Sequence, residues 1–273
     1  FPSIVKVPGF LDVALDDVLR TRAPLDDSFA FTGTDMVRPA LLANVEGVRR
    51  LAAAARSVEP CPRVLLISSL AAREPRLSHY AASKRAGEDA LRSAADGMAW
   101  TALRPPAVYG PGDRETLPLV RWMQRGFSPV LAEKDARFSL LFVDDLADAV
   151  CHLLESAQWA GAPFEIHDGC TGGYSWEDLI RTVARIIRRP VRRLRIPVWL
   201  LQTVARCNLL LSRGIGYAPM LTPGKVRELT HPNWVCDDAA LRQATGWEPR
   251  FQLEAGMRRT LQHLDNGCWT GEG

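Results

Sequence analysis

The sequence has 273 residues, of which 47% are hydrophobic and 24% charged, and its 34 basic and 31 acidic side chains give a net charge of +3. This composition is typical of a globular chain with one large domain or two smaller ones, and it excludes a disordered tail, a fibrous repeat and a secreted mini-scaffold. Because phosphate binding needs a clear basic excess, the near-balance of charge argues against nucleic acid as a partner.

Neither the cysteines nor the hydropathy indicate an exported or membrane-spanning chain. The six cysteines include no CxxC pair, and a chain of this size buries an adequate core without disulfides. No run of about 18 apolar residues is present to span a bilayer, and residues 1–7 lack the pattern of a signal peptide. We therefore predict reduced thiols and a cytoplasmic location.

The first predicted element is an amphipathic helix over residues 39–56, where apolar side chains recur at helical spacing. Residues 63–68 follow as a short apolar strand, of the kind that is buried on both faces of a parallel sheet. A helix over residues 80–93 and a second buried strand at 100–103, ended by two prolines, continue the alternation. This order of elements predicts a doubly wound α/β sheet.

Further along, a strand at 139–143 leads into a helix that begins near Asp144. Asp144 and Asp145 suit the positive end of that helix dipole, so we interpret both as structural residues. After residue 168 the pattern changes to helices, basic residues and prolines. There Ser175 is the expected N-cap of a helix and Asp178 its capping-box partner.

The strongest chemical signal is a pair of serines at the end of the strand at 63–68, followed by Tyr80 and Lys84 at the start of the next helix. Positions four apart share one helix face, so the Tyr80 hydroxyl and the Lys84 ammonium group fit into one small volume. A cation near a phenol lowers its pKa toward the range of a general acid or base. A strand-end hydroxyl, from Ser69 or Ser68, is then placed to hold a carbonyl or alkoxide oxygen. These residues predict carbonyl and alcohol redox chemistry.

Six short motifs stand in a fixed order within residues 39–262. They are Asn44-Val45-Glu46-Gly47, Ile67-Ser68-Ser69, Tyr80-x-x-x-Lys84, Arg104-Pro105-Pro106-Ala107-Val108-Tyr109-Gly110-Pro111-Gly112-Asp113, Val143-Asp144-Asp145-Leu146 and Gly246-Trp247-Glu248-Pro249. In these motifs the sequence resembles the extended branch of the short-chain dehydrogenase/reductases, which includes NAD-dependent epimerases, dehydratases and 3β-hydroxysteroid dehydrogenase-like enzymes.

The resemblance implies an α/β fold with a Rossmann-type doubly wound parallel sheet. We expect the Rossmann-type dinucleotide-binding domain in residues 1–168 and a smaller, mostly helical substrate domain in residues 169–273, with residues 111–136 contributing to the substrate lobe.

The resemblance also implies roles for single residues. Tyr80 is the acid/base catalyst, and Lys84 binds the cofactor ribose and lowers the pKa of the tyrosine. Ser69 binds the substrate oxygen, with Ser68 as the weaker candidate because the interval to Tyr80 is slightly short for the family. Asn44 supports a water relay.

The implied cofactor is NADP or NAD, with NADPH slightly favoured. Tyr80, Lys84, Pro105 and Val108 are the expected contacts, the last two approaching the nicotinamide largely through backbone atoms. A dinucleotide fold normally opens with a glycine-rich turn that contacts the pyrophosphate, and no such motif precedes Asn44. The 43 residues before it are also too few for the opening half of the family fold. We expect this turn to lie outside the present sequence, and a degenerate cofactor lobe is the alternative.

One position bears on nucleotide-sugar substrates. Family members that act on them commonly carry an arginine five residues before the Val-Asp-Asp element, where it holds the diphosphate. Here that position is Phe138, with Arg137 displaced by one residue. This substitution disfavours a nucleotide sugar.

Within residues 181–213, seven arginines in residues 181–195 are followed by a leucine-rich helix. Four apolar residues share one face of this helix: Leu200, Val204, Cys207 and Leu211. A basic flank beside such a helix is typical of peripheral contact with a membrane surface, here the inner face of a membrane. The alternative is that the helix is an ordinary wall of the substrate domain. In both cases an apolar wall beside Tyr80 favours a hydrophobic substrate, such as a sterol, a flavonoid-like ring system or a 3-oxo acyl lipid, including an oxidised ceramide.

We therefore predict an NAD(P)-dependent oxidoreductase that transfers a hydride to or from a lipid-like ketone or alcohol, with Tyr80 as acid/base. A nucleotide-sugar epimerase or dehydratase is one alternative. A non-catalytic Rossmann scaffold subunit is the other, which the missing glycine turn favours and the intact Ser69, Tyr80 and Lys84 oppose. No metal site is predicted, because the five histidines lack metal-ligand spacing. Helices like 41–56 and 80–95 often form dimer contacts in the family, so a homodimer is considered as well.

Overall fold

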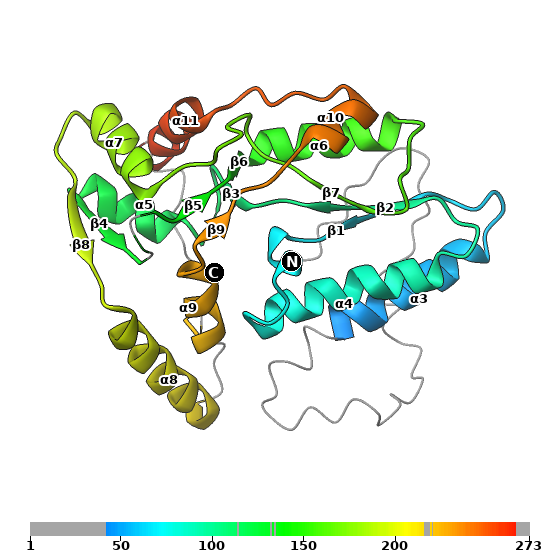
Figure 1. Ribbon diagram of the computed structural model, residues 1–273, viewed down its shortest axis with the longest axis horizontal. Coiled ribbons are helices and arrows are strands. Elements are labelled where there is room, and N and C mark those ends of the chain that lie inside the picture. Colours follow the sequence, from blue (N-terminus) through cyan, green and yellow to red (C-terminus); the bar gives the residue numbers. More distant parts are fainter. Residues whose placement is uncertain are drawn as a thin grey trace.

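The computed structural model describes residues 42–113, 115–131, 133, 135–215, 219 and 221–265. At its centre lies a parallel sheet of three strands in the order β1–β2–β7, formed by β1 (Val64–Ile67), β2 (Trp100–Arg104) and β7 (Pro163–Glu165). Helical elements cover both faces of this sheet (Figure 1). One face carries η1 (Leu42–Glu46), α3 (Gly47–Arg56) and α4 (His79–Ala94), and the other carries α6 (Val143–Glu155) and α10 (Ala239–Thr245).

The period-2 alternation of β1 explains how one strand serves both layers. Val64 and Leu66 pack against the apolar cluster of α3 and α4, whereas Leu65 and Ile67 pack against the cluster that contains α6. Both clusters are apolar, so the predicted doubly wound α/β fold is confirmed. The β1 residues are only half-buried, rather than fully buried as expected, since the outer edge of β1 has no strand partner among the described residues.

The predicted elements of the first half of the chain are present close to their expected bounds. The helix at 39–56 appears as the π-helical turn η1 followed by α3, the strand at 63–68 as β1, the helix at 80–93 as α4 and the strand at 100–103 as β2. Later in the chain, the strand at 139–143 appears as β6 (Leu140–Phe142), which runs directly into α6.

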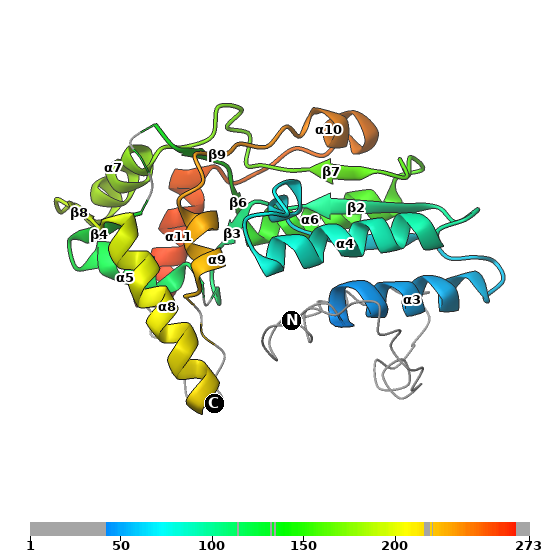
Figure 2. The same ribbon diagram turned by 60° about the horizontal axis from the view of Figure 1, so that its bottom comes forward.

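A second group of elements packs beside the sheet (Figures 1 and 2). Its strands form three parallel pairs: β3 (Ala107–Tyr109) with β6, β4 (Phe127–Val130) with β8 (Arg192–Arg195), and β5 (Arg137–Phe138) with β9 (Asn233–Trp234). Its helices are α5 (Leu117–Gln124), α7 (Trp176–Ile187), α8 (Val198–Ile215), α9 (Pro223–Leu229) and α11 (Leu253–Asp265). The boundary between two domains at residue 168 stays a prediction.

Local signals set the starts of these helices. The predicted capping box of α7 is present, with the Ser175 side chain accepting from the Asp178 amide and Asp178 accepting from the Ser175 amide. Thr222 caps α9, which has Pro223 in its first turn. Ser78 caps α4 by accepting from the amide of Ala81. The cap of α4 matters most here, because it fixes the turn that carries Tyr80.

Gly87 allows η1 to pack directly on α4. A Cβ atom on this glycine would lie 2.3 Å from the carbonyl oxygen of Asn44. We expect Gly87→Ala to destabilise the protein by about 1–3 kcal/mol, because backbone must move to relieve the overlap. Urea unfolding measures this change. Gly47→Ala is the matched control, since its Cβ would be 3.6 Å from the Leu42 carbonyl oxygen, an ordinary contact. Equal stability of the two variants would contradict this account.

Candidate active site

Tyr80 lies in the first turn of α4, at the edge of the sheet where β1 ends, and it is 45% exposed. Its hydroxyl lies close enough to the Ser69 side chain for the two to interact. Lys84, one turn further along α4, places its Nζ 5.9 Å from the centre of the Tyr80 ring and donates a hydrogen bond to the carbonyl oxygen of Ile67 at 3.3 Å. The structure thus brings Ser69, Tyr80 and Lys84 together at the carboxyl end of β1, where parallel α/β sheets bind their ligands.

The two candidate serines have different surroundings. Ser69 caps the 3-10 helix η2 (Leu70–Arg73) by accepting from the amide of Ala71 at 3.2 Å, and it contacts Tyr80. Ser68 is buried, and its hydroxyl donates to Oε1 of Glu88 at 2.5 Å. Ser69 is therefore the serine that shares a site with the tyrosine.

Glu88 anchors α4 to the sheet beneath this site. It is fully buried and receives hydrogen bonds from the guanidinium of Arg104, from Nε to Oε1 at 2.8 Å and from Nη2 to Oε2 at 2.5 Å. Since Ser68 stands at the end of β1 and Arg104 at the end of β2, one carboxylate fixes α4 against both strands. This arrangement sets the distance between Ser69 and Tyr80.

Asn44, the predicted water-relay residue, lies on η1 against the middle of α4. Its Nδ2 donates to the hydroxyl of Ser83 at 3.0 Å, and that hydroxyl donates to the carbonyl oxygen of Tyr80 at 2.8 Å. The side chain therefore contacts the residue next to Lys84 in sequence. Hydrogen bonds through Ser83 thus link Asn44 to the backbone of Tyr80.

The two predicted nicotinamide contacts lie on the segment that leaves β2. The carbonyl oxygen of Pro105 accepts from the amide of Leu70 at 2.9 Å, which ties this segment to the start of η2, next to Ser69. Val108 is half-buried in β3, where it pairs with Leu141 of β6. These contacts attach Pro105 to the start of η2 and Val108 to β6.

The pKa of Tyr80 is raised above its ordinary value, chiefly by burial; the interaction with Ser69 and the positive charge of Lys225 act in the opposite direction. This net direction differs from the lowering by Lys84 that the sequence suggested. Lys84 is itself partly buried, which lowers the pKa of its ammonium group, and that ammonium donates to Ile67. Burial therefore outweighs the two influences that lower the pKa of Tyr80, which come from Ser69 and Lys225.

This pKa direction predicts a pH dependence. Tyr80 stays protonated through neutral pH, so it is ready to donate a proton, and we expect carbonyl reduction to be flat there and to decline only as the pH exceeds the usual tyrosine value of about 10. The reverse oxidation needs the ionised form and should rise over the same range. Single-turnover rates in both directions, with circular dichroism to verify folding, measure this. A reduction rate that falls between about pH 6 and 8, the range in which histidine side chains titrate, would point to a different acid.

Helix α9 docks on the start of α4, a contact that no sequence motif indicated. Ser78 donates a short hydrogen bond to Glu228, and Arg227 donates from Nε to the carbonyl oxygen of Leu77 at 2.7 Å. A Cβ on Gly224 would lie 2.8 Å from the Cβ of Ser78, so the helices touch closely. The docking brings Lys225 near Tyr80, where burial lowers the pKa of this lysine but its acidic neighbours raise it overall.

Lys225 is held by carboxylates from two elements. Its Nζ lies 3.2 Å from Glu115 and 3.8 Å from Glu228. Since Glu115 precedes α5 and Glu228 belongs to α9, the lysine links the start of α5 to α9 near Tyr80. Glu115 and Lys225 are far apart in the sequence, so helical or strand periodicity did not predict this contact.

Phe138 and Arg137 bear on substrate class. The Phe138 ring packs edge-on against Trp176, with 5.5 Å between ring centres, next to the core formed by α5, α7 and α11. Arg137 forms an exposed ion pair with Asp178 at 3.6 Å. Neither side chain is arranged as the diphosphate-binding arginine that nucleotide-sugar enzymes commonly have at this place.

Asp145 and Trp247 make structural contacts, which for Asp145 is the role that the sequence suggested. Asp145 is buried at the start of α6 and accepts hydrogen bonds from the amides of Arg250 and Phe251. Trp247 is buried and donates from Nε1 to Asp148 at 3.2 Å. These contacts attach the late Gly-Trp-Glu-Pro motif to α6.

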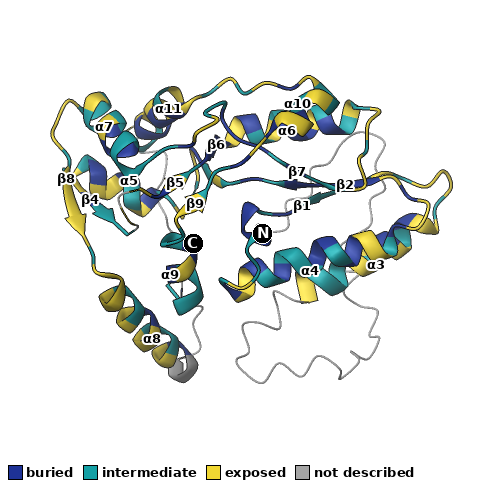
Figure 3. Ribbon diagram, in the orientation of Figure 1, coloured by how far each residue is buried: buried dark blue, intermediate teal, exposed yellow. Residues whose placement is uncertain are grey.

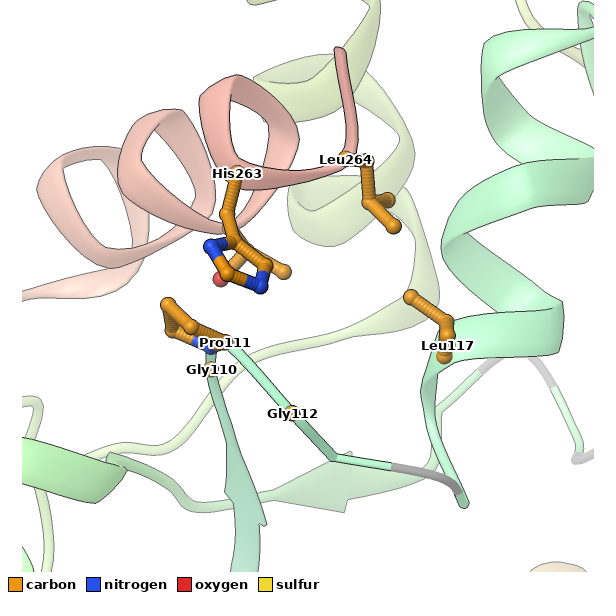
Figure 4. A pocket seen from close by; sticks show the side chains of 7 residues that line it. Gly110, Pro111, Gly112, Leu117, His263 and Leu264 are labelled. Atoms are coloured by element: carbon orange, nitrogen blue, oxygen red, sulfur yellow. The ribbon is translucent and has the colours of Figure 1, made fainter. Parts of the chain in front are cut away.

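A small pocket lies where the loop after β3 meets α11 (Figure 4). The loop contributes Gly110, Pro111 and Gly112, and the His263 side chain of α11 points toward Pro111. None of the predicted catalytic residues lines it, so we do not assign it to the active site.

The chain matches known proteins over most of its length. Residues 31–166 match the NAD dependent epimerase/dehydratase family. The chain is 37% identical over 228 residues to a ceramide reductase of Caulobacter vibrioides, covering 83% of this chain and 69% of the reductase. It is 28% identical over 211 residues to the decarboxylating sterol-4-alpha-carboxylate 3-dehydrogenase of Saccharomyces cerevisiae, covering 71% of this chain and 58% of that enzyme.

Solved structures show the same fold. The UDP-glucuronic acid 4-epimerase of Bacillus cereus, in complex with UDP-glucuronic acid and NAD, superimposes with a TM-score of 0.64 at 14% identity, over 86% of this chain and 71% of the epimerase. RMD from Pseudomonas aeruginosa, complexed with NADPH, gives a TM-score of 0.60 at 19% identity, over 83% of this chain and 73% of that protein. With the reductase match, these findings show that the chain belongs to the NAD-dependent epimerase/dehydratase family, the extended branch of the short-chain dehydrogenase/reductases, and is an oxidoreductase of that branch.

Proposed function

We propose that this chain transfers a hydride between a nicotinamide cofactor and a lipid-like ketone or alcohol. The observation that carries the proposal is the cluster of Ser69, Tyr80 and Lys84 at the carboxyl end of β1. The lipid class is supported by the named activities of two relatives, a ceramide reductase and a sterol-4-alpha-carboxylate 3-dehydrogenase. A 3-oxo acyl lipid, such as an oxidised ceramide, is the first substrate to test, followed by a sterol.

In the reduction, the bound nicotinamide supplies the hydride to the carbonyl carbon. Ser69 orients the carbonyl oxygen by donating a hydrogen bond, and Tyr80 gives its phenolic proton to that oxygen, which becomes the alcohol. Lys84 binds the ribose with the ammonium hydrogens that Ile67 does not use, and it stabilises the tyrosinate that remains. Water near Asn44 and Ser83 then returns a proton to Tyr80.

The residues present fit a nicotinamide cofactor in part. Tyr80 and Lys84 are accessible at the carboxyl end of β1, and the Pro105 backbone is tied to the same place by its bond to Leu70. The predicted glycine-rich turn has no position among the described residues. We propose NADPH over NADH, the choice that the sequence slightly favoured.

A nucleotide-sugar epimerase or dehydratase remains the second candidate, because structures with this fold include a UDP-glucuronic acid 4-epimerase. The packing of Phe138 against Trp176 speaks against it. A non-catalytic scaffold is the third candidate, and the assembled Ser69, Tyr80 and Lys84 speak against that one.

Cofactor binding and turnover decide between these candidates. Titration of the purified full-length protein with NADPH and NADH, followed by nicotinamide fluorescence, should show binding that Lys84→Ala weakens strongly. A panel of a 3-oxo sphingolipid, a 3-oxo sterol and UDP-sugars should show turnover of the lipids alone. Turnover of UDP-sugars alone would overturn the substrate class, and failure to bind either cofactor would favour the scaffold.

We also propose that the enzyme meets this substrate at the inner surface of a membrane, through residues 181–213. A homodimer through α3 and α4 is the other association considered; Leu51 of α3 is exposed and available for it. Light scattering of the purified protein tests the dimer.

A further inference from the structure

Helix α8 presents its apolar side to solvent, the reverse of an ordinary surface helix. Trp199 is 69% exposed, Leu210 63% and Leu211 58%, whereas the buried positions include the small residues Ala205 and Ser212. Successive turns add Leu200, Val204 and Cys207 to the exposed side. We call these six exposed residues, Trp199, Leu200, Val204, Cys207, Leu210 and Leu211, the outer face of α8. Four of them are the residues whose shared helical face the sequence predicted.

The position of α8 leaves this outer face accessible. The helix extends away from the sheet and the other helices, and it approaches the body chiefly through α9 (Figures 1 and 2). Exposed residues recur along its described length (Figure 3). Within the part of the chain that the structure describes, nothing packs on the outer face, so apolar area of this extent indicates an interaction site.

Strand β8, which precedes α8, adds positive charge beside the outer face of α8. All four β8 residues are exposed, including Arg192, Arg193 and Arg195. Arg193 pairs with Glu177, but Arg192 and Arg195 have no acidic partner among the described residues. The sequence from Leu179 to Arg227 contains eleven Lys and Arg and no Asp or Glu. A strongly positive segment beside an apolar face suits a partner that offers both negative charge and apolar surface.

We propose that the outer face of α8 and the β8 arginines dock on the surface of an anionic lipid bilayer. No helix among the described residues is long and apolar enough to cross a membrane, so α8 would lie along the surface. Its 18 residues give a length of about 27 Å. The outer face enters the boundary between headgroups and acyl chains, and the arginines bind lipid phosphates. Lipid chemistry is favoured over a second copy of the chain, because two such basic surfaces would repel each other.

This docking places the bilayer beside the active site, and here the inference rests on the proposed lipid substrate. Asn208 of α8 donates to the carbonyl oxygen of Leu221 at 3.0 Å, just before α9. In turn, Glu228 of α9 accepts a hydrogen bond from Ser78, the N-cap of α4. Ser78 lies two residues before Tyr80 in the sequence. Among the described residues, α9 therefore links α8 to the turn that carries Tyr80, which gives a substrate that resides in the membrane a route to the proposed site.

Vesicle flotation tests the docking directly. The full-length protein should float with vesicles of phosphatidylglycerol and phosphatidylethanolamine, much less with pure phosphatidylcholine, and high salt should weaken the binding. Trp199→Ser with Leu210→Ser, and separately Arg192→Gln with Arg195→Gln, should each weaken it about 10-fold or more. Trp122→Ser is the apolar control and Arg258→Gln the charge control, since these side chains are exposed outside residues 181–213. Both controls should float like the wild type.

Three results would overturn the proposal. Flotation unaffected by either double variant would place any lipid contact elsewhere. A wild-type dimer that Trp199→Ser with Leu210→Ser converts to monomer would assign the outer face to a second copy. A wild-type monomer that ignores anionic vesicles would indicate that the chain covers its own outer face. Cofactor titration of the same variants separates this test from the proposed function: NADPH binding should persist when flotation is lost, and a failure of NADPH binding leaves the flotation result standing.

Discussion

Tyr80→Phe should lower the rate of carbonyl reduction by roughly 10²–10⁴-fold while leaving the fold intact. The phenolic hydroxyl next to Ser69 is the proton donor that we propose, and phenylalanine keeps the ring but removes this proton. Cofactor affinity should change little, because Lys84 remains in place beside the ring. Single-turnover reduction of a 3-oxo lipid by NADPH measures the effect.

Tyr174→Phe is the matched control for this experiment. The Tyr174 hydroxyl donates to the buried carboxylate of Asp168 at 2.7 Å, far along the chain from the site. Its loss should cost about 1–3 kcal/mol of stability and leave the rate unchanged in the folded protein. If Tyr80→Phe kept more than a tenth of the wild-type rate, the acid would have to be another group.

Glu88→Ala should give the largest loss of stability, about 3–5 kcal/mol, because it leaves the Arg104 guanidinium in the interior without its counter-charge. It also removes the acceptor of the Ser68 hydroxyl, so the end of β1 and the start of α4 lose their common anchor. Chemical unfolding followed by circular dichroism measures the free energy of unfolding.

Two further variants separate the cause of this loss. Glu88→Leu combined with Arg104→Met replaces the pair by apolar groups and should recover much of the stability that the single variant loses. Asp96→Ala breaks the exposed contact of Arg56 and Asp96, at 3.9 Å, and should cost less than about 1 kcal/mol. A Glu88→Ala effect as small as that of Asp96→Ala would show that the buried pair does not anchor α4.

The sequence predicted those features that depend on near neighbours. Helical spacing predicted that Tyr80 and Lys84 share one face of α4, and short apolar runs predicted the strands that became β1 and β2. The capping box at Ser175 and Asp178 is likewise a signal three residues long. Such features follow from backbone geometry, which any short segment carries with it.

Features that depend on distant segments were not predictable in this way. Glu88 belongs to an ordinary charged helix pattern, and only the fold shows that it is buried between Ser68 and Arg104. The approach of α9 to Ser78 joins residues 150 positions apart. The raised pKa of Tyr80 likewise depends on how much of the fold surrounds it, which spacing along a helix does not reveal.

The position of Trp247 constrains how this protein folds during synthesis. Trp247 and Leu241 complete the apolar layer between α6 and the sheet, and its earliest member, Leu65 of β1, precedes Trp247 by about 180 residues. The strands of the sheet are synthesised long before these two side chains leave the ribosome. During that interval part of the apolar layer stays exposed. Contacts of such long sequence separation also slow folding. We therefore expect the nascent chain to bind chaperones until Leu241 and Trp247 have emerged.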